Sequence, residues 1–173
     1  MAKTKGTYEY IEHPFEPIWD KNSHILILGT LPSPKSRKYG FYYGHPGNKF
    51  WATLSQILGI PQPEANVESK TKFLLSNGIA VWDVLHSCEI IGASDKSIRE
   101  PKPNVFRDII QRSKIHTIFT TGWTATDLFN DLASAEAGMQ AQYLPSTSPA
   151  NRWWVRKNGF ETWKADVTQA LSK

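Results

Sequence analysis

Short apolar runs that alternate with helical patterns constrain the fold of this chain more than any other feature of its sequence. Residues 24–29, HILILG, contain an apolar run that ends in glycine, which is typical of a buried central strand. Further strands are predicted at 79–84, 115–121 and 141–144, and helices at 48–58, 67–76, 104–112, 124–135 and, with interruptions, from residue 152 onward. This order predicts an α/β fold, a three-layer α/β/α sandwich around a central four-stranded parallel sheet.

The length and composition predict one folded domain over residues 1–173. A hydrophobic content of 40% and seven tryptophans argue against disorder. Residues 1–20, which include Pro14 and Pro17, are expected to form an irregular N-terminal wrap. No apolar run reaches the ~18 residues of a membrane span and no charged-then-apolar leader opens the chain, so we expect no membrane contact.

Cysteine content and charge limit the kinds of site and partner. Cys88 is the single cysteine, which excludes an internal disulfide framework, a cysteine-held iron–sulfur cluster and a multi-cysteine zinc site. We therefore expect a reducing, cytoplasmic location, and neither a metal nor an organic cofactor. The net charge of +4 and the pI near 9.1 favour a polyanionic partner without requiring one.

Two loops at the carboxyl ends of predicted strands carry many candidate binding groups, and ligands of such folds bind beyond these ends. The loop 29–37, GTLPSPKSR, offers hydroxyls and cations that suit phosphate oxygens, although it lacks the spacing of a P-loop. The loop 144–151, LPSTSPAN, is stiffened by its prolines and is expected to present its hydroxyls outward. The alternatives are an ordinary basic loop for the first segment and a helix-capping turn for the second.

A third segment, YGFYYGHPGNKFW at 39–51, is unusually rich in aromatic residues for a stretch that also contains several glycines. Strands and helices rarely have this composition, so the rings are not simply explained as core. Phe50 and Trp51 are the exception, because they begin the helical pattern that follows and are expected to anchor that helix in the core.

Together these segments resemble the uracil-DNA glycosylase superfamily. GTLPS and LPSTSP are similar to its two motifs, and residues 40–51 are similar to the stretch after motif one in mismatch-specific glycosylases. The hypoxanthine-DNA glycosylase branch is the closer match, because it also has segments resembling residues 82–89 and 94–98. The resemblance covers about residues 14 to 165 and implies a protein that swings a damaged base out of DNA and hydrolyses its bond to the sugar.

The resemblance also implies which residues bind the base. Tyr43 matches the aromatic on which the extruded base stacks, an interaction worth about 1–3 kcal/mol, against the alternative that it packs in the core. Asp83 stands where uracil enzymes have a base-reading asparagine and would accept the N1–H of hypoxanthine; alternatively it pairs with Ser87 or a lysine. The full base-binding set is Gly29, Thr30, Leu31, Tyr43, His45 and Asp83. His45 would serve a phosphate or the leaving base, or simply bond a backbone carbonyl.

The catalytic residue is the point at which this sequence departs from most of the superfamily. Leu31 stands where a catalytic Asp or Asn is usual, and Leu144 stands where classical uracil enzymes have a histidine. Both departures argue against uracil excision. The hypoxanthine branch is expected to use the asparagine of HPxN instead, here Asn48, which would hold a water by hydrogen bonds. Asn48 could equally be a helix N-cap, and the two roles are compatible.

The sequence thus predicts a monofunctional DNA glycosylase of base excision repair, a monomer acting on DNA with deaminated bases, hypoxanthine first among them. DNA contacts are expected from Ser33, Lys35, Ser36, Ser146, Thr147, Ser148 and Arg152. No lysine stands out as a nucleophile for strand cleavage, and Glu89 and Asp95 are expected on solvated faces. The alternatives are a uracil or G·T/G·U mismatch glycosylase and, in another class, a non-catalytic nucleic-acid-binding domain.

Overall fold

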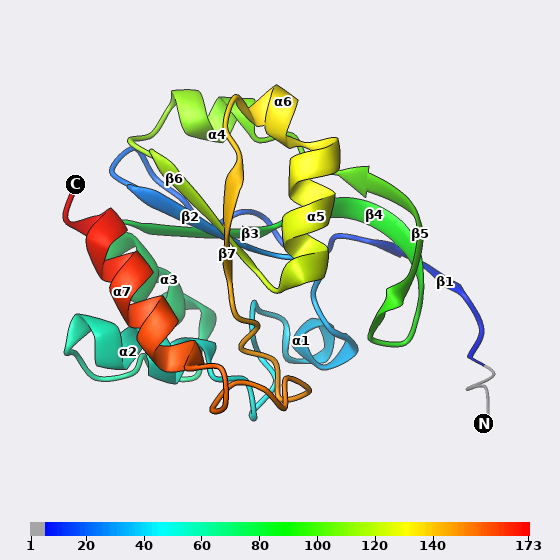
Figure 1. The fold of residues 1–173 in the computed structure, drawn as a ribbon, viewed down its shortest axis with the longest axis horizontal. Helices are drawn as coiled ribbons and strands as arrows, with labels where there is room; N and C mark the ends of the chain where they lie inside the picture. Colours follow the sequence, from blue (N-terminus) through cyan, green and yellow to red (C-terminus); the bar gives the residue numbers. More distant parts are fainter. Residues whose placement is uncertain (1–5) are drawn as a thin grey trace.

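A four-stranded parallel sheet forms the centre of the protein, whose structure, a computed structural model, describes residues 6–173 (Figure 1). The strands lie in the order β3 (Ile79–Asp83), β2 (Ile25–Gly29), β6 (Thr117–Thr121) and β7 (Ala141–Leu144). All neighbouring pairs are parallel, which confirms the predicted sheet. The apolar residues of β2 are completely buried, as expected for a strand covered on both faces.

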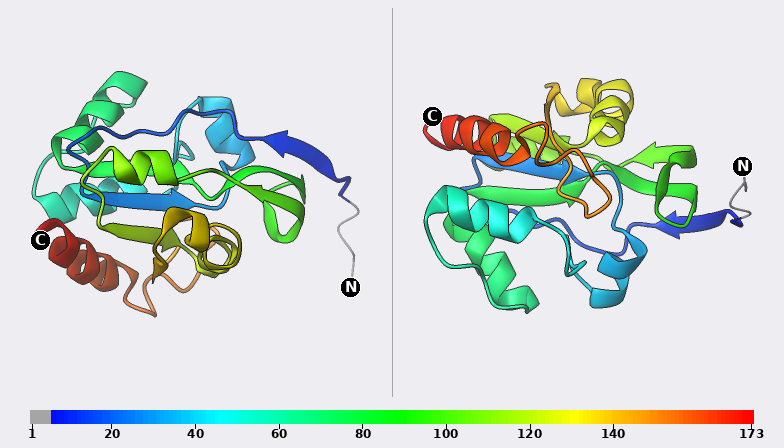
Figure 2. Two further views of the ribbon diagram at one scale, coloured as in Figure 1. Left: turned by 90° about the horizontal axis from the view of Figure 1, so that it is seen from above. Right: turned by 60° about the horizontal axis from the view of Figure 1, so that its bottom comes forward.

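Helices cover both faces of this sheet and divide the core in two (Figure 2). Alternate residues of β2 serve the two halves: Ile25 and Ile27 face one cluster, and Leu26 and Leu28 face the other. The first cluster includes side chains of α2 (Phe50–Leu58), α3 (Val67–Ser76) and α7 (Gly159–Leu171); the second includes side chains of α4 (Arg107–Gln111), α5 (Trp123–Leu132) and α6 (Ser134–Ala137). The layers are those of the predicted α/β/α sandwich.

A second, antiparallel sheet was not predicted. It has the order β1 (Glu9–Glu12), β4 (Leu85–Ile91) and β5 (Ser94–Pro103), and it projects from the main body as a long hairpin with β1 beside it (Figure 1). The expected irregular wrap over residues 1–20 is therefore wrong for Glu9–Glu12, while residues 1–5 lie outside the described part. Only Ile11 of β1 is buried, so the strand lacks the continuous apolar run by which the central strands were recognised.

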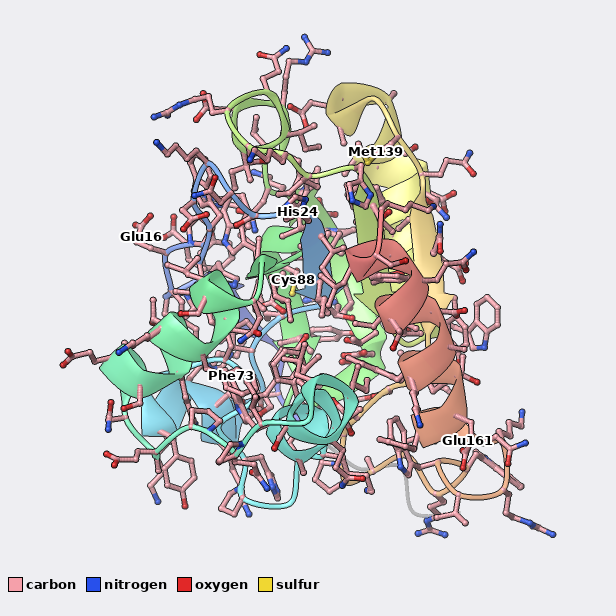
Figure 3. All side chains as sticks on the ribbon, turned by 90° about the vertical axis from the view of Figure 1, so that its left-hand side faces the viewer. Glu16, His24, Phe73, Cys88, Met139 and Glu161 are labelled. Carbon is pink, nitrogen blue, oxygen red and sulfur yellow. The ribbon has the colours of Figure 1, made fainter. Side chains whose placement is uncertain are left out.

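Buried residues of the hairpin attach it to the main body. Leu85, Cys88 and Ile90 of β4 join the second core cluster, and Figure 3 shows Cys88 in the interior. The thiol is completely buried, which fits a packing role. β5 contributes little to this core, because nearly all of its side chains are polar and at least partly exposed.

Helix starts differ from the prediction where polar side chains cap them. A short helix, α1 (Pro34–Tyr39), begins inside the predicted loop because Ser33 accepts a hydrogen bond from the Ser36 N–H. Helix α4 begins at Arg107 and not at Asn104, because Glu136 accepts hydrogen bonds from the backbone N–H groups of Phe106 and Arg107. Asn104 instead donates to the Asp83 carbonyl, 2.9 Å away.

Candidate active site

A cavity of about 850 Å³ lies beyond the carboxyl ends of the parallel strands. Its walls come from loop 29–37 after β2, from Asp83 at the end of β3, from 121–124 after β6 and from 143–151 after β7. The aromatic segment and the tip of the β4–β5 hairpin close it further. In Figure 1 the loops after β2 and β7 meet below the sheet. The loops that the sequence marked as candidates therefore line one site.

Gly29 brings the backbone close to Asp83, one of the acidic residues of the cavity. A Cβ at this position would lie 2.6 Å from Asp83 Oδ1 and 3.5 Å from the Tyr43 hydroxyl. Only glycine leaves room for both groups. The next two residues also line the cavity: Thr30 is buried and donates from Oγ1 to Asp95 Oδ2 at 3.3 Å, and Leu31 adds an apolar wall that packs on the second core cluster.

Tyr43 lines the cavity as the outer ring of a two-ring stack. Its ring lies 3.9 Å from that of Phe50, with 10° between the planes, and Phe50 is completely buried. Tyr43 also packs against the first core cluster, the alternative weighed for it, and its hydroxyl is buried without a hydrogen-bond partner in the described part of the chain. Burial and then Asp83 raise the pKa of the Tyr43 phenol, and the neighbouring Thr121 hydroxyl, which donates to the Leu28 carbonyl, only partly offsets this. The phenol is a neutral donor.

Asn48 lies just before helix α2 and borders the cavity. Its Oδ1 accepts a hydrogen bond from the Phe50 N–H at 2.9 Å and so satisfies the first N–H of the helix, although the N-cap position itself is Lys49 and not Asn48 as expected. The side chain is half-buried, and its Nδ2 has no hydrogen-bond partner within residues 6–173. One lone pair of Oδ1 and both Nδ2 protons remain for a ligand or a water.

His45 is held by a backbone hydrogen bond within the aromatic segment. Its Nδ1 accepts a hydrogen bond from the Gly47 N–H at 2.9 Å, so its proton is on Nε2. The expected backbone alternative was a bond to a carbonyl; the observed bond is to an N–H. A Cβ at Gly47 would lie 3.3 Å from both the His45 ring and Pro149, which places the aromatic segment directly against the loop after β7. His45 lines the cavity with an N–H donor.

Asp83 is paired with His13, a residue that sequence reasoning did not select. His13 Nε2 lies 2.7 Å from Asp83 Oδ2, and their side chains are only 2% and 6% exposed. His13 Nδ1 lies 2.9 Å from the Phe15 carbonyl and 3.2 Å from the Phe15 N–H, which donates to it, so the Phe15 backbone holds the ring in place. The expected pairing of Asp83 with Ser87 or a lysine is wrong. No sequence signal could have found His13, because it lies 70 residues from Asp83 in the unpatterned N-terminal segment.

Asp95 lies at the start of β5, where it is exposed, as expected for it, and also lines the same cavity. Burial by the surrounding walls raises the pKa of its carboxyl although part of its surface is exposed; the Thr30 hydrogen bond opposes the rise and Asp83 adds to it. Glu89 does lie on a solvated face, where it pairs with Arg99 at 2.7 Å. The cavity therefore contains two acidic groups, one of them unforeseen.

The residues expected to bind DNA fall into three groups. Ser33, Ser146 and Ser148 are half-buried and line the cavity. Lys35 and Arg152 are exposed but do not line it. The remaining two, Ser36 and Thr147, line the cavity but are buried, so the outward hydroxyl expected for loop 144–151 is wrong at Thr147.

Thr147 and Ser36 are buried because both support neighbouring loops. Thr147 is 1% exposed, and its carbonyl accepts a hydrogen bond from the Lys49 N–H. Ser36 Oγ accepts hydrogen bonds from the Gly44 N–H and from Ser33 Oγ. Sequence patterns could not separate these hydroxyls from their exposed neighbours. Arg37, one of the cations of loop 29–37, lines the cavity, and so do two cations that were missed, Lys96 and Lys157.

The fold and the motifs are matched by known proteins. A family model described as the uracil DNA glycosylase superfamily matches residues 17–172. The chain belongs to this superfamily. That membership confirms the resemblance carried by its motifs.

Two curated proteins and one solved structure from Methanosarcina species are similar to this chain over most of its length. A curated protein of Methanosarcina acetivorans named hypoxanthine DNA glycosylase is 34% identical over 156 residues, covering 90% of this chain and 97% of its own. One of Methanosarcina barkeri with the same name is 34% identical over 158 residues, covering 84% and 93%. A solution NMR structure of a Methanosarcina acetivorans protein described as a candidate uracil DNA glycosylase superposes with a TM-score of 0.78 at 31% identity, covering 94% of this chain and 99% of that one.

The side chains around the cavity suit an organic ligand. Within residues 6–173 no group of three or more His, Cys, Asp or Glu side chains is placed to hold a metal ion. In the same range no helix is long and apolar enough to cross a membrane. The side chains that do converge are an aromatic face, an amide, an imidazole N–H and a carboxylate, which together can stack a planar ring, read its edge and position a water.

Proposed function

We propose that this protein is a monofunctional DNA glycosylase that extrudes a deaminated base, hypoxanthine first among them, and hydrolyses its N-glycosidic bond. The observation that carries the proposal is that Tyr43, Asn48 and Asp83 line one cavity beyond the strand ends. The chain around them is 34% identical to curated hypoxanthine DNA glycosylases over most of its length. We further propose that it acts in the cytoplasm as a monomeric single domain over residues 1–173, without a metal or cofactor.

Asp83 is proposed to recognise the base. Its Oδ2 is fixed by His13, and its Oδ1, which lies over Gly29, has no hydrogen-bond partner in the described part of the chain. Deamination of adenine converts N1 from an acceptor into an N–H donor, and deamination of cytosine does the same at N3. A carboxylate can accept from that N–H, whereas against adenine it would face a lone pair and stay unpaired.

Asn48 is proposed to hold the attacking water, and Tyr43 to hold the base. As the bond between C1′ and N9 breaks, its electron pair goes to the purine and the sugar develops positive charge. The hydroxyl of the water then bonds C1′, and its remaining proton neutralises the departed purine. Asn48 is no base at neutral pH, so its part is to orient the water through Oδ1 or Nδ2. The Nε2–H of His45 supplies a donor for negative charge on the leaving base.

The contacts with the DNA backbone are proposed for residues around the cavity mouth. They are Ser33, Ser146, Ser148, Lys35 and Arg152, with Arg37, Lys96 and Lys157 added from the structure. These contacts position the DNA strand without selecting its sequence. Because the cations among them neutralise phosphates, binding should weaken steeply with salt.

The test is an excision assay on oligonucleotides that carry inosine, uracil, xanthine or a G·T mismatch, treated with alkali to break the strand at abasic sites. We expect inosine to be processed fastest and breaks to require the alkali. Faster cutting of uracil would mean that the substrate assignment is wrong, and breaks without alkali would mean that the enzyme is not monofunctional. If the parent protein cuts none of these oligonucleotides, a non-catalytic binding domain is the better description.

Asn48→Ala separates chemistry from helix capping when it is compared with a matched variant. Asn66→Ala removes a similar cap, because Asn66 Oδ1 accepts from the Ser69 N–H at 2.7 Å at the start of α3, far from the cavity lining. Both variants should lose about 1 kcal/mol of stability. Only Asn48→Ala should lose excision while it retains DNA binding, and equal activity of the two variants would remove Asn48 from the chemistry.

A further inference from the structure

The cavity contains a second aromatic stack with the same geometry as the first. Trp123 and Tyr143 lie with ring centroids 3.9 Å apart and 10° between their planes, the values also found for Tyr43 and Phe50. Both Trp123 and Tyr143 line the cavity. The first stack borders the exits of β2 and β3, whereas the second joins the start of α5 to the edge strand β7.

We propose that Trp123 is a second base platform, on which an unpaired nucleobase of the same DNA strand stacks while the deaminated base is held on Tyr43. The inference rests on the proposed function, since it presumes a DNA strand in the cavity. It assigns a separate ligand, a nucleobase that is not excised, to a part of the cavity for which the excision chemistry has no use.

The position of Trp123 suits stacking better than packing. The residue is 63% exposed, while the side chains that attach α5 to the core are Ala125, Thr126 and Phe129. Tyr143 covers one face of the indole and is itself fixed in β7, where it pairs with Thr120 of β6. The other face is therefore presented to solvent by a ring whose orientation is already set, so that little side-chain entropy would be lost when a base binds.

Charge around the cavity favours a nucleotide as the occupant. Arg37, Lys96 and Lys157 line the same cavity as both stacks. Lys157 also lies 5.7 Å from the ring centre of Trp153, a further exposed aromatic residue at the cavity wall. A strand that crossed the cavity would meet aromatic faces for its bases and cations for its phosphates, the combination typical of single-strand binding. The cavity of about 850 Å³ exceeds the space that one base fills.

Binding of single-stranded inosine oligonucleotides tests the platform, with the base removed at one neighbouring position at a time. These measurements use proteins that carry Asn48→Ala, so that the substrate stays intact. In this background, Trp123→Ala should weaken binding about tenfold. Removing one particular neighbouring base should weaken binding to Trp123-containing protein by a similar factor and leave binding to the Trp123→Ala variant unchanged.

Two variants control for the ring and for exposure. Trp123→Phe preserves a stacking face and should stay close to the unsubstituted affinity. Tyr10→Ala removes an aromatic residue that is also 63% exposed but lies on β1, outside the cavity lining, and should have no effect. If Trp123→Phe falls as far as Trp123→Ala, or if Tyr10→Ala falls equally, stacking at this site is the wrong explanation.

The remaining outcomes separate the inference from the function on which it rests. An unchanged affinity of Trp123→Ala overturns the platform even when inosine excision by the parent protein is normal. If removal of the partner base in a duplex, and no base of the inosine strand, reproduces the effect of Trp123→Ala, the same-strand assignment is wrong. Absence of excision by the parent protein, together with the expected pattern of base removal, would reject the glycosylase proposal and leave the platform standing.

Discussion

His13→Ala is the perturbation for which the structure gives the largest expected effect. The change removes the partner of Asp83 and leaves a carboxylate that is 6% exposed without its 2.7 Å hydrogen bond. Breaking a buried pair by deleting one member costs about 3–5 kcal/mol, because the other charge stays buried and unpaired. The ring also has aromatic neighbours, with Phe15 and Tyr42 centred 6.0 and 5.9 Å away, so some packing is lost as well.

Thermal unfolding measures this loss directly. At roughly 2–4 °C per kcal/mol for a chain of this size, the melting temperature should fall by about 6–20 °C. His86→Ala is the matched control, because His86 also faces a carboxylate, Glu12 at 3.3 Å, but with side chains that are 52% and 63% exposed. An exposed pair of this kind is worth roughly 0–1 kcal/mol. His13→Gln, which can retain a donor toward Asp83, should recover part of the loss.

The double variant His13→Ala with Asp83→Asn identifies the cause. If the loss comes from an unpaired buried charge, neutralising Asp83 should restore much of the stability that His13→Ala removes. Excision should not return, because Asp83→Asn no longer presents an ionised acceptor to the base. The reasoning is refuted if His13→Ala costs no more than His86→Ala, or if the double variant is as unstable as the sum of its parts.

Two further predictions concern the cavity itself. Gly29→Ala places a Cβ 2.6 Å from Asp83 Oδ1, so the carboxylate must shift; steady-state excision of inosine should fall at least about tenfold, and circular dichroism should show a retained fold. Asp95→Asn should stabilise the protein near pH 7. The pKa of the Asp95 carboxyl is raised in the folded state above its ordinary value of 3.8, so the folded state binds this proton more tightly than the unfolded state does. The free energy of unfolding therefore falls as the pH rises above 3.8, and the substitution removes this loss. Denaturant unfolding from pH 4 to 8 should show the gain shrinking toward acid, and a pH-independent difference would contradict this account.

The central sheet could be predicted because three of its four strands, β2, β3 and β6, combine a buried position with a local apolar run. Residues 25–28 are apolar without a break because both faces of β2 are covered. The helical patterns between the strands predict that the strands run parallel. The antiparallel hairpin gave no such signal, since Lys96, Arg99 and Lys102 belong to a mostly exposed strand whose register is interrupted. The strand β5 is held in place by its pairing with β4, and the composition of β5 does not reveal this pairing.

The candidate site divides in the same way. Asn48 and Asp83 stand inside recognisable segments, so their place in the cavity could be anticipated, and they stay proposed site residues. His13 and Trp123 could not be anticipated, because each acquires its position from contacts with residues far along the chain, Asp83 and Tyr143. Thr147 was misplaced for the opposite reason: its neighbours Ser146 and Ser148 border the cavity more openly, and a run of hydroxyls does not reveal which of them turns inward.

We propose that base recognition and hydrolysis use different residues because position 31 is a leucine. A leucine cannot orient a water, and here it forms an apolar wall at the position where the superfamily usually has its catalytic carboxylate or amide. The neighbouring Thr30 hydroxyl is already engaged by Asp95. Two cavity groups that could take part in catalysis are the Asn48 amide and the His45 Nε2–H, both in the aromatic segment. In the proposed arrangement Asp83 does not replace them, since a carboxylate that accepts from the far edge of a purine is separated by the whole base from a water attacking C1′. We therefore expect the proposed recognition by Asp83 and the proposed hydrolysis at Asn48 to be separable by mutation.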